Sequence, residues 1–199
     1  MGQRDEATEW DAERERRFRE GWVEAPGRID GVVRLVEYDE GWVGRYEREA
    51  EGIRGELGDQ VVRVEHIGST SVPGLAAKPI IDILLVVPDP VDEEAYIPGL
   101  VRAGYRLVVR EPDWYEHRLL RKQPDDDVNL HTFGPGSPEI ERYLRFRDHL
   151  RTDDGDRRLY EETKRRLAGR RWQYVQQYAD AKTEVVEEIM TRARGRTSQ

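Results

Sequence analysis

The sequence has no cysteine among its 199 residues, and no apolar run in it is long enough to cross a membrane. The first absence excludes disulfide bonds, thiolate metal sites and a cysteine nucleophile. The second excludes a transmembrane helix, which needs roughly 18 consecutive apolar residues. The first 20 residues also lack the apolar segment of a secretory signal peptide, so we expect a cytoplasmic protein.

Charged residues are abundant instead, and the acidic ones prevail. The chain has 33 Lys and Arg against 41 Asp and Glu, which gives a net charge of −8. Disordered chains of this charge lack long apolar segments, whereas IIDILLVV and LVRAGYRLVV provide them here, so the sequence predicts a folded domain. The negative charge disfavours sequence-independent binding to duplex DNA, because such binding needs many cations that face phosphates.

Hydrophobic periodicity divides the chain into an extension and one domain. Residues 1–27 predict a charged helix over about 6–20 and a linker, and we expect this extension to be an appendage or a docking arm for a protein partner. Residues 28–199 predict an α/β or α+β domain with a mixed central sheet and a helical C-terminal portion over about 138–193. We expect strands at 32–38, 61–67, 79–87, 105–110, 114–122 and 127–133, and helices at about 40–57, 92–103, 138–151, 153–168 and 172–193.

Asp82 is the most informative residue, because it interrupts the apolar run PIIDILLVV at 79–87. A run without alternation indicates a strand that is covered on both faces. An ionised carboxylate in such a strand is costly unless a cation, a metal or strong hydrogen-bond donors meet it. The sequence offers Lys78, four residues earlier, or a bound divalent cation. The alternative is that Asp82 lies at the strand end, where it caps a turn or pairs with an arginine.

A turn rich in glycine and serine, Gly68-Ser69-Thr70-Ser71, follows a predicted strand and precedes Asp82. Glycine lets the backbone approach a ligand, and hydroxyl and N–H groups together form a surface suited to phosphate. The P-loop pattern that ends in Gly-Lys-Ser/Thr is absent, so the turn alone is weak evidence and an ordinary turn is the simpler interpretation. The order of strand, turn and acidic strand resembles the way in which polymerase-beta-like nucleotidyltransferases present triphosphate and metal.

The segment 65–83, EHIGSTSVPGLAAKPIIDI, resembles the signature of the GrpB family, a group of small proteins in the nucleotidyltransferase-like superfamily. The resemblance covers about residues 33–190. It implies a minimal nucleotidyltransferase fold, in which helices flank a mixed central sheet. The further motifs that carry it lie at 38–42, 131–134, 139–150 and 178–184.

The superfamily pattern implies two carboxylates spaced i and i+2 after the turn, and a third carboxylate from a later strand. Asp82 fits the first position, but Leu84 occupies the second, which argues against a standard two-metal transfer. Strand alternation over 127–133 sets Asn129 and His131 on the face that a third ligand would use. His131 is then a metal ligand, a phosphate donor or a general base, or alternatively a structural histidine.

Three other side chains are candidates for the same site. Glu65 supplies a further negative charge beside the metal, or simply pairs with an arginine. Lys78 is the best placed cation, and Arg118 is expected to reach phosphates from the strand at 114–122. Most of the remaining cations are expected to be solvated surface groups.

Together these residues predict a protein that binds a nucleoside triphosphate, or another phosphorylated nucleotide, with Mg²⁺ or Mn²⁺. The reaction would be attack of an unknown acceptor hydroxyl on the α-phosphorus. The alternative is a catalytically inactive relative that keeps the fold as a nucleotide-binding or protein-interaction module, and a third possibility is RNA binding through the basic segment 165–172. The predicted catalytic residues are Asp82, His131 and Lys78; the predicted nucleotide-binding residues are Gly68, Ser69, Thr70, Ser71, Lys78 and Arg118; and the predicted metal ligands are Asp82, Glu65 and Asn129.

Overall fold

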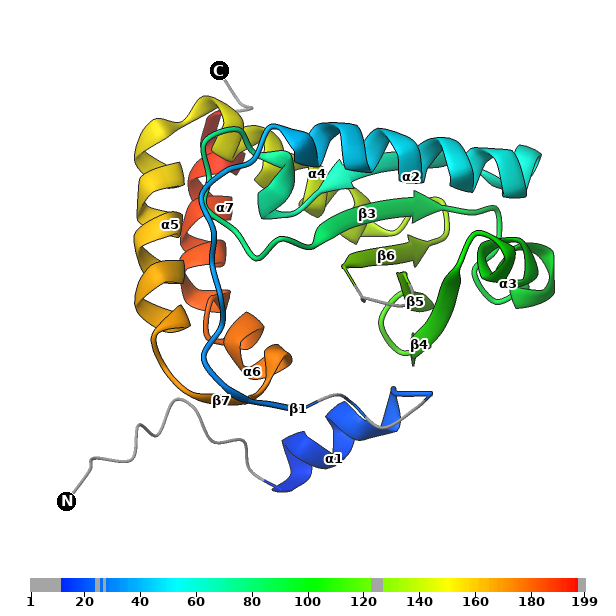
Figure 1. Ribbon diagram of the computed structural model, residues 1–199, viewed down its shortest axis with the longest axis horizontal. Coiled ribbons are helices and arrows are strands. Elements are labelled where there is room, and N and C mark those ends of the chain that lie inside the picture. The colour runs from blue at the N-terminus through cyan, green and yellow to red at the C-terminus, as the bar shows by residue number, and fades with distance from the viewer. Residues whose placement is uncertain (1–11, 24–25, 27, 123–126, 197–199) are drawn as a thin grey trace.

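A mixed sheet of five strands lies at the centre of the computed structural model, which describes residues 12–23, 26, 28–122 and 127–196 (Figure 1). The strand order is β2-β3-β6-β5-β4, in which β3 and β6 are parallel and the other neighbours antiparallel. The strands of this sheet are β2 (Arg63–Ile67), β3 (Ile81–Val86), β4 (Tyr105–Glu111), β5 (His117–Lys122) and β6 (Val128–Phe133). The predicted fold class, a mixed sheet flanked by helices with a helical C-terminal portion, is confirmed.

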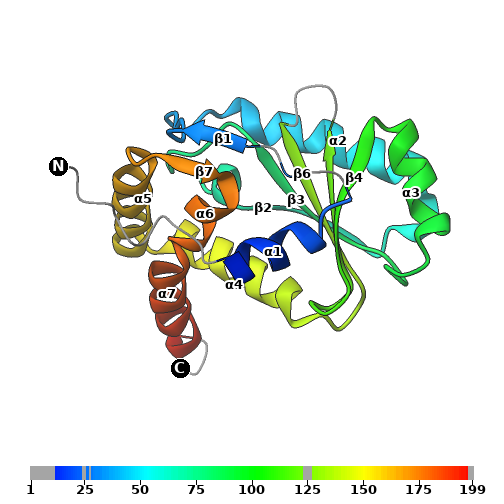
Figure 2. The same ribbon diagram turned by 90° about the horizontal axis from the view of Figure 1, so that it is seen from below.

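Helices surround the sheet on both faces and at one end (Figures 1 and 2). The helices are α1 (Ala12–Glu20), α2 (Gly41–Leu57), α3 (Glu93–Arg102), α4 (Pro138–Thr152), α5 (Asp154–Ala168), α6 (Val175–Asp180) and α7 (Thr183–Arg196). Two short 3-10 turns, η2 (Gly58–Gln60) and η3 (Ser69–Ser71), and a two-stranded ribbon of β1 (Arg28–Gly31) and β7 (Trp172–Tyr174) complete the architecture. None of the helices in the described part of the chain is both long and apolar enough to cross a bilayer.

The apolar run of β3 is buried on both faces, as its lack of alternation predicts. Ile81 and Ile83 pack with residues of α2 and α3 in the larger core cluster. Leu84 and Val86 point to the opposite face and pack with residues of α4 in a smaller cluster. Because side chains alternate along a strand, Asp82 lies on the α4 face of the sheet.

Two predicted elements are wrong. Residues 32–38 form no strand, and this stretch makes only an isolated bridge between Val36 and Ala77. The predicted helix at 172–193 is divided into β7, α6 and α7, because Trp172–Tyr174 pairs with Arg28–Gly31, which lies far away in the sequence. Sequence periodicity cannot reveal such a partner.

The N-terminal helix packs against the domain and spans from α6 toward β4 (Figure 2). Arg14 forms an ion pair of 2.8 Å with Asp180 of α6. Beyond the helix, Gly21 and Val23 form backbone hydrogen bonds with β4, of which the bond from the Arg110 amide to the Gly21 carbonyl measures 2.7 Å. The segment after the helix, predicted to be a linker, therefore extends the sheet edge at 21–23. Residues 6–11 of the predicted helix lie outside the described residues.

Candidate functional site

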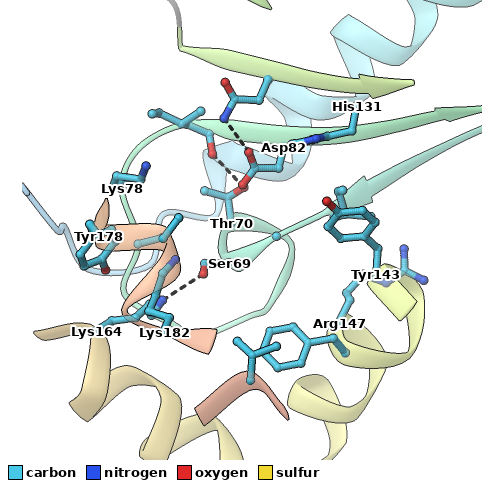
Figure 3. A pocket seen from close by; sticks show the side chains of 18 of the residues that line it. Ser69, Thr70, Lys78, Asp82, His131, Tyr143, Arg147, Lys164, Tyr178 and Lys182 are labelled. Carbon is cyan, nitrogen blue, oxygen red and sulfur yellow. Dashed lines mark hydrogen bonds between the residues drawn. The ribbon is translucent and has the colours of Figure 1, made fainter. Parts of the chain in front are cut away.

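A cavity of about 530 Å³ lies between the α4 face of the sheet and helices α5, α6 and α7 (Figure 3). Its sheet wall is formed by polar residues of β3, β5 and β6, where the apolar cluster of that face ends. Carboxylates at Asp82 and Asp180 line it, whereas the cations that line it are Lys78, Arg121, Arg142, Arg147, Lys164 and Lys182. A chain with a net charge of −8 thus concentrates positive charge around one cavity.

The turn after β2 passes directly over Asp82. Gly68 has φ +69° and ψ −173°, a backbone conformation that is essentially restricted to glycine. A Cβ atom at this position would lie 2.3 Å from Oδ2 of Asp82, so a larger residue would collide with the carboxylate. The antiparallel register, which places Ile67 opposite Asp82, brings turn and carboxylate together. The predicted turn and the predicted acidic residue thus lie next to each other.

Asp82 is held by a neighbouring strand and by nearby cations. The side-chain amide of Asn129 on β6 donates a hydrogen bond of 2.9 Å to Oδ1 of Asp82. Burial raises the pKa of Asp82, while the Asn129 hydrogen bond and the charges of Lys78 and Lys182 act in the opposite direction. The structure thus supplies the donors and cations that an acidic group within an apolar strand requires.

Lys164 of α5 holds the turn from the opposite side of the cavity. Its Nζ donates hydrogen bonds to Oγ of Ser69, at 3.1 Å, and to the carbonyl of Ala76. Only 2% of Lys164 is exposed, and burial together with the charge of Lys182 lowers its pKa to about 7. An anionic neighbour would stabilise the charged form of a lysine in such surroundings.

Lys78 and Lys182 both lie near the aromatic ring of Tyr178. Their Nζ atoms are 6.0 and 4.7 Å from the centroid of Tyr178. Burial lowers the pKa of both lysines to about 8, and Lys182 further disfavours the charge on Lys78. Neither lysine forms an ion pair within the described residues, which leaves both ammonium groups available to a ligand in the cavity.

Two residues of this cluster, Lys164 and Tyr178, were not predicted as site residues, and Lys182 was expected on a helix surface. The hydroxyl of Tyr178 is buried and has no hydrogen-bond partner in the described part of the chain. A signal for the lysines does exist in the sequence. Of its 33 cationic residues only four are lysines, and three of these four line the cavity.

The hydroxyl groups of the turn have different roles from those predicted. Ser69 lines the cavity beside Lys164. The Thr70 hydroxyl donates to the carbonyl of Ile80 at 3.2 Å, and the Ser71 hydroxyl donates to the carbonyl of Gly68 at 2.6 Å. Thr70 and Ser71 are buried and shape the turn, whereas Gly68 and Ser69 line the cavity with backbone and hydroxyl groups.

Besides Ser71, two predicted site residues lie outside the cavity. Glu65 is bound by Arg147 at 2.9 Å and by Arg63 at 3.0 Å, the arginine pairing that was the alternative to a metal ligand. Arg118 is buried on the opposite face of the sheet, where it binds Glu93 at 2.8 Å. The expected phosphate contact of Arg118 is wrong, because alternation along β5 turns its side chain away from the cavity.

His131 of β6 lines the cavity on the same face as Asp82, as the alternation of 127–133 predicts. Its Nδ1 lies 3.1 Å from Nε2 of a second buried histidine, His117 of β5. Burial and the neighbouring His117 lower the pKa of His131 to about 3, so the ring is neutral at physiological pH.

The donor set fits one divalent cation rather than two. Mg²⁺ is commonly held by one or two carboxylates together with substrate phosphates, and Asp82 offers one such carboxylate. Leu84, where the second carboxylate of a two-metal centre would lie, is fully buried in the apolar cluster against α4. The side-chain amide of Asn129 orients the Asp82 carboxylate, which is the group in the cavity that could hold such a cation.

A second group of potential metal ligands lies at the junction of α4 and α5. Side-chain atoms of His149, Asp153 and Asp156 are all within 4.8 Å of one another. Asp156 already binds Arg192 at 2.6 Å, and Asp153 accepts the Asp156 amide as the N-cap of α5. These contacts explain the cluster as part of the structure that joins α4 and α5.

Comparison with known proteins agrees with this description. Residues 32–192 match the family model of the GrpB protein. A UPF0157 protein of Halalkalibacterium halodurans is 56% identical over 161 residues, which are 81% of this chain and 82% of the relative. The crystal structure of the conserved protein GrpB from Enterococcus faecalis matches 83% of this chain and 100% of its own chain, with a TM-score of 0.74 and 32% identity.

A much weaker structural likeness is also found. The Cid1 poly(U) polymerase matches 66% of this chain and 45% of its own chain, with a TM-score of 0.40 and 7% identity. The family match, in contrast, spans most of the chain and includes the turn, Asp82 and the lysines of the cavity. The chain belongs to the GrpB family.

Proposed function

We propose that the protein binds a nucleoside triphosphate in the cavity and transfers its nucleotidyl group to an acceptor hydroxyl. The observation that carries this proposal is the convergence of Lys78, Lys164 and Lys182 beside Asp82 and the Gly68 turn. Three ammonium groups around one carboxylate leave an excess of positive charge, which a polyphosphate would neutralise. The cavity, at about 530 Å³, also has the size of small-molecule sites.

The phosphates would lie between the turn and the lysines. Ser69 already has a polar partner in Lys164, so a phosphate oxygen at this point would contact both side chains. Lys78 and Lys182 lie near the ring of Tyr178, whose unpartnered hydroxyl offers a further hydrogen bond to the phosphates. Binding an anion here would raise the pKa of the lysines toward the usual value for lysine.

Asp82 would hold one Mg²⁺, which supplies charge neutralisation to a bound triphosphate. In the proposed reaction the acceptor oxygen forms a bond to the α-phosphorus, and the bond from that phosphorus to the bridging oxygen of pyrophosphate breaks. Lys164 and Lys182 stabilise the negative charge that develops on the leaving group. Asn129 keeps the Asp82 carboxylate oriented during this step.

Isothermal titration with ATP, GTP, CTP and UTP, each with and without Mg²⁺, tests the binding step. We expect saturable binding of at least one nucleotide and a loss of about tenfold in affinity in Lys182→Ala. The matched control is Lys122→Ala, which removes the one lysine outside the cavity and should retain the wild-type affinity. Absence of binding at millimolar nucleotide would contradict the proposal.

A specific observation favours a second candidate function, a nucleotide-binding module without catalysis. Leu84 removes the second carboxylate of a two-metal centre, and the apolar packing around it excludes a metal there. Incubation of cell extract with radiolabelled nucleotide separates the two functions. A labelled product that disappears in Asp82→Asn supports transfer, whereas nucleotide binding without any labelled product supports the module.

A further inference from the structure

Three side chains form a hydrogen-bonded chain from the protein surface to the cavity. Oε2 of Glu111 lies 2.7 Å from Nδ1 of His117, and Nε2 of His117 lies 3.1 Å from Nδ1 of His131. Glu111 is 43% exposed at its side chain, whereas His117 is only 3% exposed. His131 lines the cavity, where Figure 3 shows its ring pointing inward beside Asp82.

This chain determines which nitrogen of His131 carries hydrogen. A carboxylate only accepts hydrogen bonds, so Nδ1 of His117 must donate to Glu111. When His117 is a neutral imidazole, its other nitrogen is an acceptor, and Nε2 of His117 then accepts a hydrogen bond from Nδ1–H of His131. Nε2 of His131 is therefore without hydrogen. Within the described residues it has no hydrogen-bond partner, so its lone pair is open to a ligand.

Aromatic packing fixes the rings in this arrangement. The two imidazoles are stacked with 5.3 Å between their centroids and an interplanar angle of 19°. The ring of Phe133 stacks on His117 at 4.7 Å, and Trp114 contacts it edge-on at 4.8 Å. Tyr143 of α4 lies 5.7 Å from the ring of His131. Packing on several sides leaves neither imidazole free to reorient, which is what a positioned base requires.

We propose that Glu111 and His117 hold His131 with a bare Nε2, and that this nitrogen accepts the hydroxyl proton of the acceptor substrate. The proposal rests on the transfer function proposed above and restricts its second substrate to molecules with a free hydroxyl group. As the acceptor oxygen bonds to the α-phosphorus and pyrophosphate leaves, the hydroxyl proton moves to Nε2 of His131. His117 and Glu111 are positioning residues, because their hydrogen bonds fix which nitrogen of His131 carries hydrogen.

The tautomer can be measured without substrate, by long-range ¹⁵N–¹H correlation NMR of the histidine rings. We expect the wild-type protein to show His131 with hydrogen on Nδ1 and none on Nε2. In Glu111→Gln the preference of His117 weakens, because a side-chain amide can donate as well as accept, and a fraction of His131 moves to the Nε2–H form. The matched control is Glu116→Gln, an exposed neighbour that binds Arg118 on the opposite face and should leave the histidine signals unchanged.

Activity gives the second measurement. We expect Glu111→Gln to bind ATP with wild-type affinity but to form labelled transfer product about tenfold more slowly, and His131→Gln to lose about 100-fold. Hydrogen on Nε2 of His131 in the wild-type protein would overturn the relay, as would an unchanged transfer rate in His131→Gln. A failure to bind any nucleotide would instead refute the proposed function, and the NMR result for the histidines would stand independently.

Discussion

The two faces of the five-stranded sheet are built from the same strands but differ in chemistry. On the face toward α2 and α3, the inward residues of β3 and β6 are apolar, among them Ile83 and Leu130, and they belong to the largest core cluster. On the opposite face, the residues adjacent to them in sequence include Asp82, Asn129 and His131, which line the cavity. β3 and β6 thus contribute to the larger core with every second residue, and to the cavity with some of the residues in between.

The comparison also shows how the fold accommodates buried polar groups on the face that carries Asp82, Asn129 and His131, which we call the polar face. Asp82 is met by Asn129, and Lys164 is met by the turn, so these two buried groups have partners, whereas the buried hydroxyl of Tyr178 has none in the described part of the chain. Even so, burial lowers the pKa of three lysines, which means that their charged forms are disfavoured in the folded state. The apolar face must supply the free energy that offsets this cost, and substitutions on the two faces should therefore act on different measured quantities.

The largest expected effect is a difference in unfolding free energy between substitutions at two neighbouring residues, Ile83 and Asp82. Ile83→Ala should lower the free energy of unfolding by about 3 kcal/mol, because it opens a cavity in a fully buried core, and should leave nucleotide affinity within about twofold. Asp82→Asn should keep or raise the unfolding free energy while it weakens Mg²⁺-dependent nucleotide binding. Urea denaturation and calorimetric titration measure the two quantities. Equal losses of unfolding free energy in both variants would contradict the conclusion that the two faces serve stability and binding separately.

Gly68→Ala is the next largest perturbation, and it acts on the polar face alone. The substitution should destabilise the protein by about 2 kcal/mol, because the backbone conformation is restricted to glycine and the added Cβ collides with Asp82. Thermal unfolding of this variant can be compared with that of Gly52→Ala, where an added Cβ meets no atom within 4 Å on α2. A Gly68→Ala protein as stable as Gly52→Ala would contradict the close approach of turn and carboxylate.

The buried lysines predict a pH dependence of stability. Lys164 has a pKa of about 7 in the folded protein, below the usual value near 10.5, so the unfolded chain binds more protons between these values. The free energy of unfolding should therefore rise from pH 7 to pH 9, by on the order of 1 kcal/mol. In Lys164→Met, denaturant titrations across this range should show a smaller rise. A wild-type stability that falls with pH would show that these ammonium groups are fully paired.

The smallest expected effect concerns the edge of the polar face. The guanidinium carbon of Arg121, which lines the cavity, lies 5.3 Å from the ring centroid of Trp22. Trp22→Ala should cost about 1 kcal/mol of unfolding free energy and change nucleotide affinity by less than about threefold, because the N-terminal segment supports the cavity from outside. Denaturation and titration of this variant test both values. A loss of affinity above tenfold would place the N-terminal segment inside the site.

Much of the site could be predicted because its signals are local in the sequence. Asp82 stands out against an apolar strand, the Gly68 turn precedes it, and two-residue alternation places Asn129 and His131 on one face. Arg118 was assigned to the site without a pattern that fixed its face, and the structure turns it to the opposite side. Lys164 could not be predicted to meet Ser69, because 95 residues separate them and only helix packing brings them together.

The sequence alone determined the sheet, most of its strands and the acidic group beside the glycine turn, since periodicity and turn chemistry act over a few residues. Tertiary structure decided which cations surround that group, because α5 and the turn between α6 and α7 deliver Lys164 and Lys182 from positions that no local pattern relates to β3. It also decided that His117 contacts His131, a pairing set by the register of β5 against β6. Long-range packing creates such contacts, and sequence periodicity contains no record of them.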